Sequence, residues 1–258
     1  MSAPETTVRV RVDLAYDGGG FRGWARQRDT AVRTVQAVVD DALATLAQAP
    51  VDTTVAGRTD AGVHADRQVV HCDVPAGCRL VADLERAREA LDALCGPEIT
   101  VWRVRRVPRA FDARFSARQR RYRYRICDAV ALHPLERHRT WHAGLPRLDT
   151  QAMRAGGHHL VGEHDFSSFC RRAGDQHLVR RIDELAVRRR SAGLVTVDVA
   201  GKAFCHQMVR SIVGALVRVG RARRDPHWVA EVLAARDRQA VGDIAPPHGL
   251  TLSGVVYT

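Results

Sequence analysis

The chain reads Ala56-Gly57-Arg58-Thr59-Asp60-Ala61-Gly62-Val63-His64 just beyond the apolar residues Val51 and Val55. Asp60 therefore stands two residues after Arg58 in a glycine-bounded segment, which favours a turn after a short strand. Charged side chains on such loops are frequent catalytic or binding groups. The alternatives are a surface turn closed by the aspartate side chain, or an Arg58–Asp60 ion pair that contributes little to stability.

The composition favours a globular protein with a polyanionic partner. A chain of 258 residues, 45% of them hydrophobic and 27% charged, can form one large domain or two packed ones. Its formal net charge of +11 attracts phosphate backbones. No segment reaches the roughly 18 uninterrupted apolar residues of a membrane span, and the first residues lack the basic-then-apolar order of a signal peptide. We therefore expect no membrane contact and a cytoplasmic location.

Cysteine and histidine spacing indicates neither a disulfide framework nor a metal site. The six cysteines include no C-x-x-C pair, so we expect reduced and mostly buried thiols at Cys72, Cys78, Cys95, Cys127, Cys170 and Cys205. The histidine-rich run from His158 to His164 lacks the H-E-x-x-H order of zinc enzymes, and the end of an amphipathic helix explains it equally well. No metal is expected.

Apolar periodicity predicts strands and helices that recur in a similar order in both halves of the chain. In the first half we expect strands at 8–16, 52–55, 68–74 and 100–107, and helices at 35–46, capped by Thr34, and 81–94. In the second half we expect strands at 121–126 and 194–199, a helix capped by Asp149, a helix at 206–219, and a last helix that Asp225-Pro226 begins. This order predicts an α+β (mixed α/β) fold of two similar domains, 1–108 and 109–258, with mainly antiparallel or mixed sheets, flanking helices and a cleft between the domains.

The glycine-rich turn Gly18-Gly19-Gly20-Phe21-Arg22-Gly23 matches the G-x-G-x-x-G pattern of dinucleotide-binding proteins. Such a turn opens directly into a helix whose N-terminus receives the pyrophosphate, whereas the predicted helix begins only near Thr34. Asp40, at about the distance of a ribose-binding acid, falls inside that helix. A flexible turn explains these glycines better than nucleotide binding.

Arginines concentrate between residues 103 and 125, where Asp112 is the one acidic residue. The segment Phe111-Asp112-Ala113-Arg114-Phe115-Ser116-Ala117 interleaves arginine with aromatic rings, which suits phosphate contact and base stacking; a strand or helix rim is the alternative. Tyr122 and Tyr124 then alternate with arginines on a strand and share one face, where core packing is the default.

Arg210 lies two positions from Met208 and from Ile212, which define the apolar face of the helix predicted at 206–219. This spacing favours a surface position. A buried arginine there would need a carboxylate partner.

The segments that contain Asp60, residues 111–117, Tyr122 and Arg210 resemble the signature segments of the tRNA pseudouridine synthase A family and occur in the same order. The resemblance extends along the length of the chain. Further matches are at 35–36, 68–71, 165–169 and 249–252. The resemblance implies that Asp60 is the nucleophile, that Tyr122 stacks on the target uracil, and that Arg210 pairs with Asp60. It also implies that tRNA is contacted by Arg58, Phe111, Arg114 and Phe115.

The family resemblance further implies a pseudouridine synthase fold, a homodimer and a reaction without cofactor at uridines 38 to 40 of the tRNA anticodon stem-loop. Asp60, Tyr122 and Arg210 are then expected to converge in one basic cleft. Departures at Arg67, at Cys72 and through 171–177 concern the path of the RNA. The alternatives are a non-catalytic basic RNA-binding protein and a nucleotide-dependent enzyme.

Overall fold

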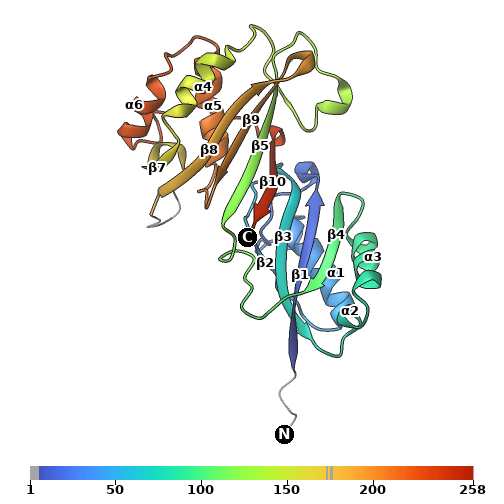
Figure 1. Cartoon of the computed structure of the whole chain (residues 1–258). Helices are drawn as coiled ribbons and strands as arrows, with labels where there is room; N and C mark the ends of the chain where they lie inside the picture. Colours follow the sequence, from blue (N-terminus) through green and yellow to red (C-terminus); the bar gives the residue numbers. More distant parts are fainter. Residues whose placement is uncertain (1–5, 173, 175–176, 258) are drawn as a thin grey trace. The chain divides into compact units, whose positions relative to one another are not determined.

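The computed structural model describes residues 6–172, 174 and 177–257. Residues 1–5, considered above for a leader peptide, and three positions of the 171–177 segment lie outside the described residues. The chain divides into two compact units (Figure 1). Unit 1 contains the described residues up to Arg118 and those from Leu252 onward, and unit 2 runs from Gln119 to Thr251. The predicted domain boundary, 108/109, lies ten residues before this division.

Unit 1 is built on antiparallel strands. Strand β1 (Thr7–Tyr16) pairs with β3 (His64–Pro75) on one edge and β4 (Ile99–Arg106) on the other, and the short β2 (Thr54–Val55) pairs with β3. Val10, Val12, Leu14 and Tyr16 alternate along β1 and are all buried, as the period-2 pattern predicts. The last strand, β10 (Leu250–Val256), begins in unit 2 and ends in unit 1.

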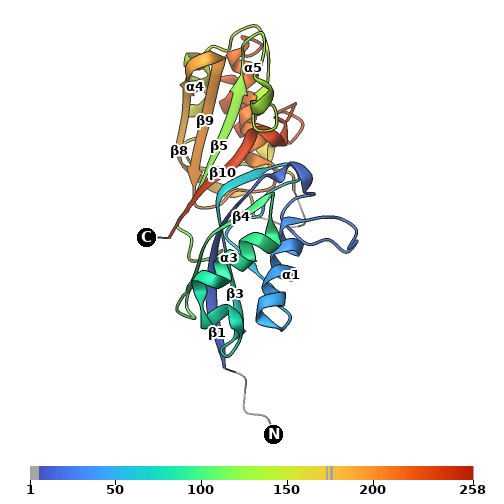
Figure 2. The same ribbon diagram turned by 90° about the vertical axis from the view of Figure 1, so that its right-hand side faces the viewer.

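Three helices flank these strands, α1 (Val35–Ala47), α2 (Arg79–Ala82) and α3 (Leu84–Cys95) (Figure 2). The Thr34 hydroxyl accepts a hydrogen bond from the amide of Ala37 and caps α1, which confirms the predicted start of this helix. The Asp83 carboxylate caps α3 in the same way.

Unit 2 has a mixed sheet in the order β5 (Gln119–Cys127), β9 (Leu194–Gly201), β8 (Val179–Arg189) and β7 (Gly162–Asp165). These strands are antiparallel, whereas β6 (Trp141–His142) runs parallel to β5. The predicted α+β class with mixed sheets and flanking helices is thereby confirmed.

The helices of unit 2 are α4 (Thr150–His158), α5 (Met208–Gly220) and α6 (Trp228–Ala235), and α4 contacts the other two (Figure 1). Asp149 caps α4, as predicted. Helix α6 starts later than predicted, because Asp225 forms a turn with the amide of His227 in place of a cap. No helix within the described ranges is long and apolar enough to span a membrane.

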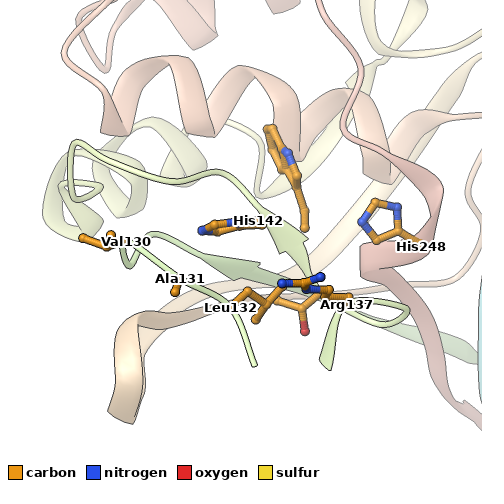
Figure 3. Close-up of a pocket in the computed structure, with 8 residues that line it drawn as sticks. Val130, Ala131, Leu132, Arg137, His142 and His248 are labelled. Carbon is orange, nitrogen blue, oxygen red and sulfur yellow. The ribbon is translucent and has the colours of Figure 1, made fainter. Parts of the chain in front are cut away.

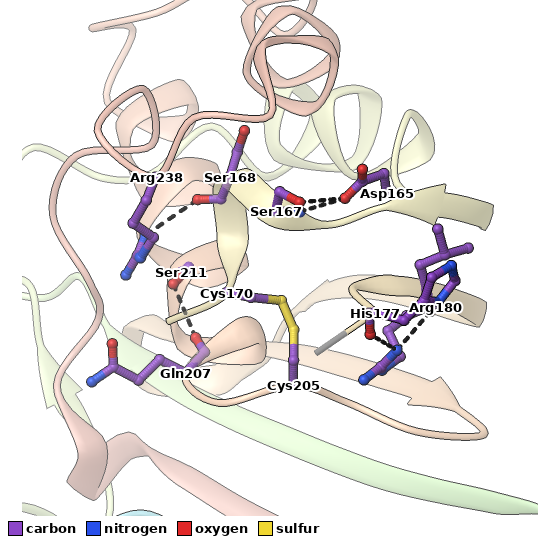
Figure 4. Close-up of a disulfide and its surroundings, with 11 residues drawn as sticks. Asp165, Ser167, Ser168, Cys170, His177, Arg180, Cys205, Gln207, Ser211 and Arg238 are labelled. Carbon is purple, nitrogen blue, oxygen red and sulfur yellow. Dashed lines mark hydrogen bonds between the residues drawn. A yellow bond between two sulfur atoms is a disulfide. The ribbon is translucent and has the colours of Figure 1, made fainter. Parts of the chain in front are cut away.

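Cys170 and Cys205 form a disulfide, so the expectation of six reduced thiols is wrong for these two (Figure 4). Cys170 follows the 3-10 turn η3 (Ser167–Phe169), and Cys205 precedes α5; 35 residues apart in sequence, their Cα atoms lie 5.7 Å from each other. The adjacent backbones are also joined, because the amide of Arg171 donates to the carbonyl of His206 at 2.9 Å. No local spacing signals this pair, since only the fold brings the two segments together. The free cysteines are Cys72, Cys78, Cys95 and Cys127, and all but Cys78 are buried.

Candidate active site

Asp60 lies in unit 1, on the loop between β2 and β3. Exposure alternates along this loop: Arg58 is exposed, Thr59 is buried and Asp60 is half-buried. The Asp60 carbonyl accepts the amide of Val63 at 3.1 Å and closes the turn, in which Gly62 has a φ of 77°. The predicted turn is therefore present. The side chains of Arg58 and Asp60 lie on either side of the buried Thr59.

The glycine-rich turn is the support of the Asp60 loop. The amide of Trp24 donates to the Thr59 carbonyl at 3.0 Å, and the amide of Gly62 donates to the Phe21 carbonyl at 3.3 Å. Gly23 has a φ of 97°, and a Cβ there would lie 3.1 Å from the Thr59 carbonyl oxygen and 3.2 Å from the amide nitrogen of Ala61. Helix α1 starts at Val35, well after this turn. Close backbone approach therefore accounts for Gly23, and the expected delay before the helix is confirmed.

The 111–117 segment of unit 1 is a turn organised by Asp112. Its carboxylate accepts the amides of Arg114 at 2.7 Å and Phe115 at 2.8 Å, and its own amide donates to the Ser116 hydroxyl at 3.0 Å. Phe115 is 77% exposed, with the Arg114 guanidinium 5.1 Å from its ring centre. The turn thus presents an arginine and an aromatic ring together.

Phe111 is partly buried in unit 1, unlike Phe115, the other aromatic residue predicted to contact tRNA. Its ring lies 5.0 Å from that of Tyr257 and 6.1 Å from that of His71, and it packs on a small buried cluster of Ala56, Val69 and Ala113. His71 also accepts the amide of Ala113 through Nδ1 at 2.9 Å. Phe111 and His71 thereby hold the 111–117 turn to unit 1. His71 lies in a segment that matches the family, but the sequence assigns it no partner.

The two tyrosines of unit 2 lie on β5 and point into its core face. Tyr122 is 8% exposed, and its ring meets that of Phe204 edge-on, with centres 5.2 Å apart. Tyr124 is fully buried, its hydroxyl donates to the Pro246 carbonyl at 2.6 Å, and burial raises its pKa well above the ordinary value. The structural role predicted for Tyr124 is confirmed.

Arg210 is the third residue of α5 and is half-buried. Its Nε donates to the Ala245 carbonyl at 2.8 Å, and the Ala245 amide donates to the Arg210 carbonyl at 3.1 Å. The chain can approach here because Gly214, one turn further on, lies against the Asp243 carbonyl, which a Cβ would meet at 2.2 Å. The 243–245 segment therefore holds both the backbone of Arg210 and the Nε atom of its side chain.

Several arginines of the basic stretch have structural partners from outside it. Arg123 pairs with Asp198 at 2.7 Å, and Arg125 pairs with Glu136. Arg106 donates to the Val81 carbonyl at 2.6 Å. The formal charge of this stretch therefore overstates what is available to a polyanion.

The predicted site residues form no metal-binding cluster, and they lie outside the pocket of unit 2. Among residues 6–172, 174 and 177–257, no group of three or more His, Cys, Asp or Glu could hold a metal ion. A pocket of about 420 Å³ lies in unit 2, with His142 and His248 on two sides of it and Leu132 and Arg137 beneath (Figure 3). None of the predicted site residues lines it.

Comparison with known proteins defines the class. Residues 158–258 match the family model described as tRNA pseudouridine synthase. Proteins named tRNA pseudouridine synthase A are 48% identical in Frankia casuarinae, over 97% of this chain and 89% of that protein, and 44% identical in Streptomyces avermitilis, over 97% and 88%. The relative of that name in Methylococcus capsulatus is 44% identical over 97% of this chain and 90% of its own length. These likenesses define the class of the chain as a pseudouridine synthase, which is an isomerase.

The chain belongs to the tRNA pseudouridine synthase A family.

Proposed function

We propose that this enzyme converts uridine to pseudouridine at positions 38 to 40 of the tRNA anticodon stem-loop, with Asp60 as the nucleophile. The observation that carries the proposal is the Asp60 loop: a half-buried carboxylate stands beside an exposed arginine, on a backbone held by hydrogen bonds from Trp24 and to Phe21. A net charge of +11 supports a nucleic acid substrate.

The reaction requires only groups that this chain supplies. The bond between C1′ and N1 breaks, the uracil turns, and C5 bonds to the same C1′. The C5 hydrogen leaves as a proton and N1 gains one, so no atoms are transferred to a co-reactant and no cofactor is needed. Ionised Asp60 attacks either C6 of the base, which attaches the uracil to the enzyme, or C1′ of the ribose, which displaces the uracil and attaches the sugar. The bond to Asp60 breaks again as the product with the C5–C1′ bond is released, so the carboxylate is regenerated.

Arg58, Tyr122 and Arg210 receive distinct roles in this proposal. A base in a stem must be extruded at a cost of a few kcal/mol, and Arg58, exposed beside Asp60, grips the displaced strand or fills the gap. Tyr122 stacks on the uracil and Arg210 pairs with Asp60 and orients its carboxylate, as the family resemblance implies.

The 111–117 turn supplies the main tRNA contact outside the reacting base. Phe115 offers a ring for stacking and Arg114 a cation for a phosphate, while Phe111 anchors the turn. Family resemblance also supports a homodimer and a cytoplasmic location. Light scattering behind a sizing column tests the former, and a mass of one chain would contradict it.

The test is to map pseudouridine in tRNA transcripts after incubation with the purified protein. The expected result is pseudouridine at uridines 38, 39 or 40, and none in matched transcripts that carry cytidine at those positions. Pseudouridine elsewhere would contradict the proposed site. Unchanged RNA despite tight binding would favour the non-catalytic RNA-binding protein.

A further inference from the structure

Three buried polar side chains lie directly behind the Asp60 loop. The Tyr16 hydroxyl is 2.8 Å from the Thr59 hydroxyl, and Gln68 Nε2 donates both to the Tyr16 hydroxyl at 3.2 Å and to the Gly57 carbonyl at 2.8 Å. Tyr16 is 4% exposed, Thr59 8% and Gln68 not at all. The network thus joins β1 and β3 to the two residues that flank Arg58.

The orientation of each member is determined by its partners. Gln68 uses both amide hydrogens in these bonds, and its Oε1 accepts the amide of Val69 at 3.2 Å, so a flipped amide would lose the bonds to Gly57 and Val69. Burial raises the pKa of Tyr16 to about 12, so its hydroxyl keeps its proton near neutral pH. Tyr16 follows a register shift between Leu14 and Tyr16 in the pairing of β1 with β3, a device that redirects side chains.

Packing alone does not require this network. Buried hydroxyl and amide groups lose hydration, and an apolar set of similar volume would fill the same space without that cost. A fully bonded polar network instead specifies one conformation of the groups it joins. Here the joined group is Thr59, whose two neighbours in the chain are Arg58 and Asp60.

We propose that Tyr16 and Gln68 are positioning residues that hold Thr59, and through it Arg58 and Asp60, in the conformation in which Asp60 attacks the substrate. This inference rests on the proposed role of Asp60. Nucleophile placement controls rate steeply, so loosening the loop lowers turnover more than it lowers tRNA affinity.

The test uses Thr59→Val, which removes the hydroxyl at nearly constant shape, and Tyr16→Phe, which removes its partner. Each is expected to lower kcat roughly 10- to 100-fold with the Kd for tRNA changed less than about twofold. Both changes remove the bond between Tyr16 and Thr59, and Tyr16→Phe also removes the bond from Gln68, so the double variant should lose about as much as Tyr16→Phe alone. Thr59→Ser restores the hydroxyl and should recover most of the rate.

The matched control is Thr53→Val, also in unit 1, which removes an equally buried hydroxyl that bonds to Asp40. It should lower the thermal midpoint without lowering kcat per folded enzyme. The folded fraction of every variant is measured by circular dichroism, and rates are expressed per folded molecule. Wild-type turnover in both Thr59→Val and Tyr16→Phe, or no recovery in Thr59→Ser, would overturn the positioning role.

The same assay separates this inference from the proposed function. Turnover retained by Asp60→Asn would show that Asp60 is not the nucleophile, and it would contradict the proposed function. An inactive Asp60→Asn together with a fully active Thr59→Val would contradict the positioning network alone.

Discussion

At the scale of single residues, burial decides what the carboxylates of unit 1 can do. Asp60 is half-buried on a loop, whereas Asp40 is 3% exposed on α1. The Thr53 hydroxyl donates to Asp40 at 2.6 Å, and Arg26 lies 3.9 Å from its second oxygen. Burial outweighs the bond from Thr53 and raises the pKa of Asp40 from 3.8 to about 6.

This pKa predicts a pH-dependent stability. The folded protein binds the Asp40 proton more tightly than the unfolded chain does, so stability falls as the pH rises from about 4 through about 6, and the cost is complete above that range. A shift of about two units corresponds to roughly 3 kcal/mol. Asp40→Asn should therefore gain unfolding free energy relative to wild type at pH 8 and gain only about half as much at pH 5, measured by urea denaturation.

The control for this prediction is Asp41→Asn, next to Asp40 on the same helix, because the Asp41 side chain is 71% exposed. Its effect should be similar at both pH values. An equal pH dependence in the two variants would contradict the assignment to Asp40.

Thr59 marks the limit of sequence interpretation at this scale. Resemblance assigned Arg58 and Asp60, but Thr59 received no role because its partners Tyr16 and Gln68 come from two other strands. Asp60 could be proposed from its sequence neighbours in a glycine-bounded turn, whereas the network behind Thr59 depends on tertiary structure.

At the scale of elements, the tRNA contacts proposed for the 111–117 turn are of two kinds, a charged contact from Arg114 and a stacking contact from Phe115. Arg114→Ala should weaken tRNA binding and reduce the slope of log affinity against log salt by about 1, because one phosphate contact is lost. Phe115→Ala should cost about 1–3 kcal/mol of binding free energy and leave the slope unchanged, because stacking releases no counterions. Fluorescence anisotropy with labelled tRNA at several salt concentrations measures both.

The comparison for Phe115 is Trp102→Ala, since Trp102 is an aromatic residue of β4 that is 60% exposed. Its affinity for tRNA should equal that of the wild type. An equal loss in the two aromatic variants would mean that the 111–117 turn is not a specific contact.

The Cys170–Cys205 disulfide predicts a second measurable property of the elements. Closing a loop of 35 residues restricts the unfolded chain and contributes about 4 kcal/mol in the chain-entropy account. Protein denatured without reductant should therefore take up alkylating agent at four cysteines, and reduction should lower the thermal midpoint. Cys78→Ser should leave the midpoint unchanged, and alkylation of all six cysteines without reductant would contradict the pairing.

Strand β8 shows why the predicted elements were incomplete. Its sequence Val179–Arg189 is rich in arginine, and Ile182 and Val187 are its fully buried residues, so no clear alternation marks it. It is a strand because β9 and β7 supply hydrogen bonds on its two edges. By contrast, α1 and α4 were predictable because capping by Thr34 and Asp149 is local.

At the scale of the whole molecule, a division into two parts was predictable from the sequence. Which residues belong to each part was not predictable. The C-terminal residues belong to unit 1: the Arg118 amide donates to the Val256 carbonyl at 2.8 Å, and the Tyr257 hydroxyl donates to the Ala113 carbonyl at 2.8 Å. Such contacts join residues more than a hundred positions apart. Periodicity describes each element alone and carries no signal for them.

Asp60→Asn is the decisive variant for the proposed role of Asp60 as the nucleophile of a uridine isomerase. The side chain keeps its size but loses the negative charge needed for attack. Tritium release from tRNA labelled at C5 of uridine should be abolished, while the Kd for the same tRNA stays within about twofold of wild type. Continued tritium release by a folded Asp60→Asn protein would contradict the account.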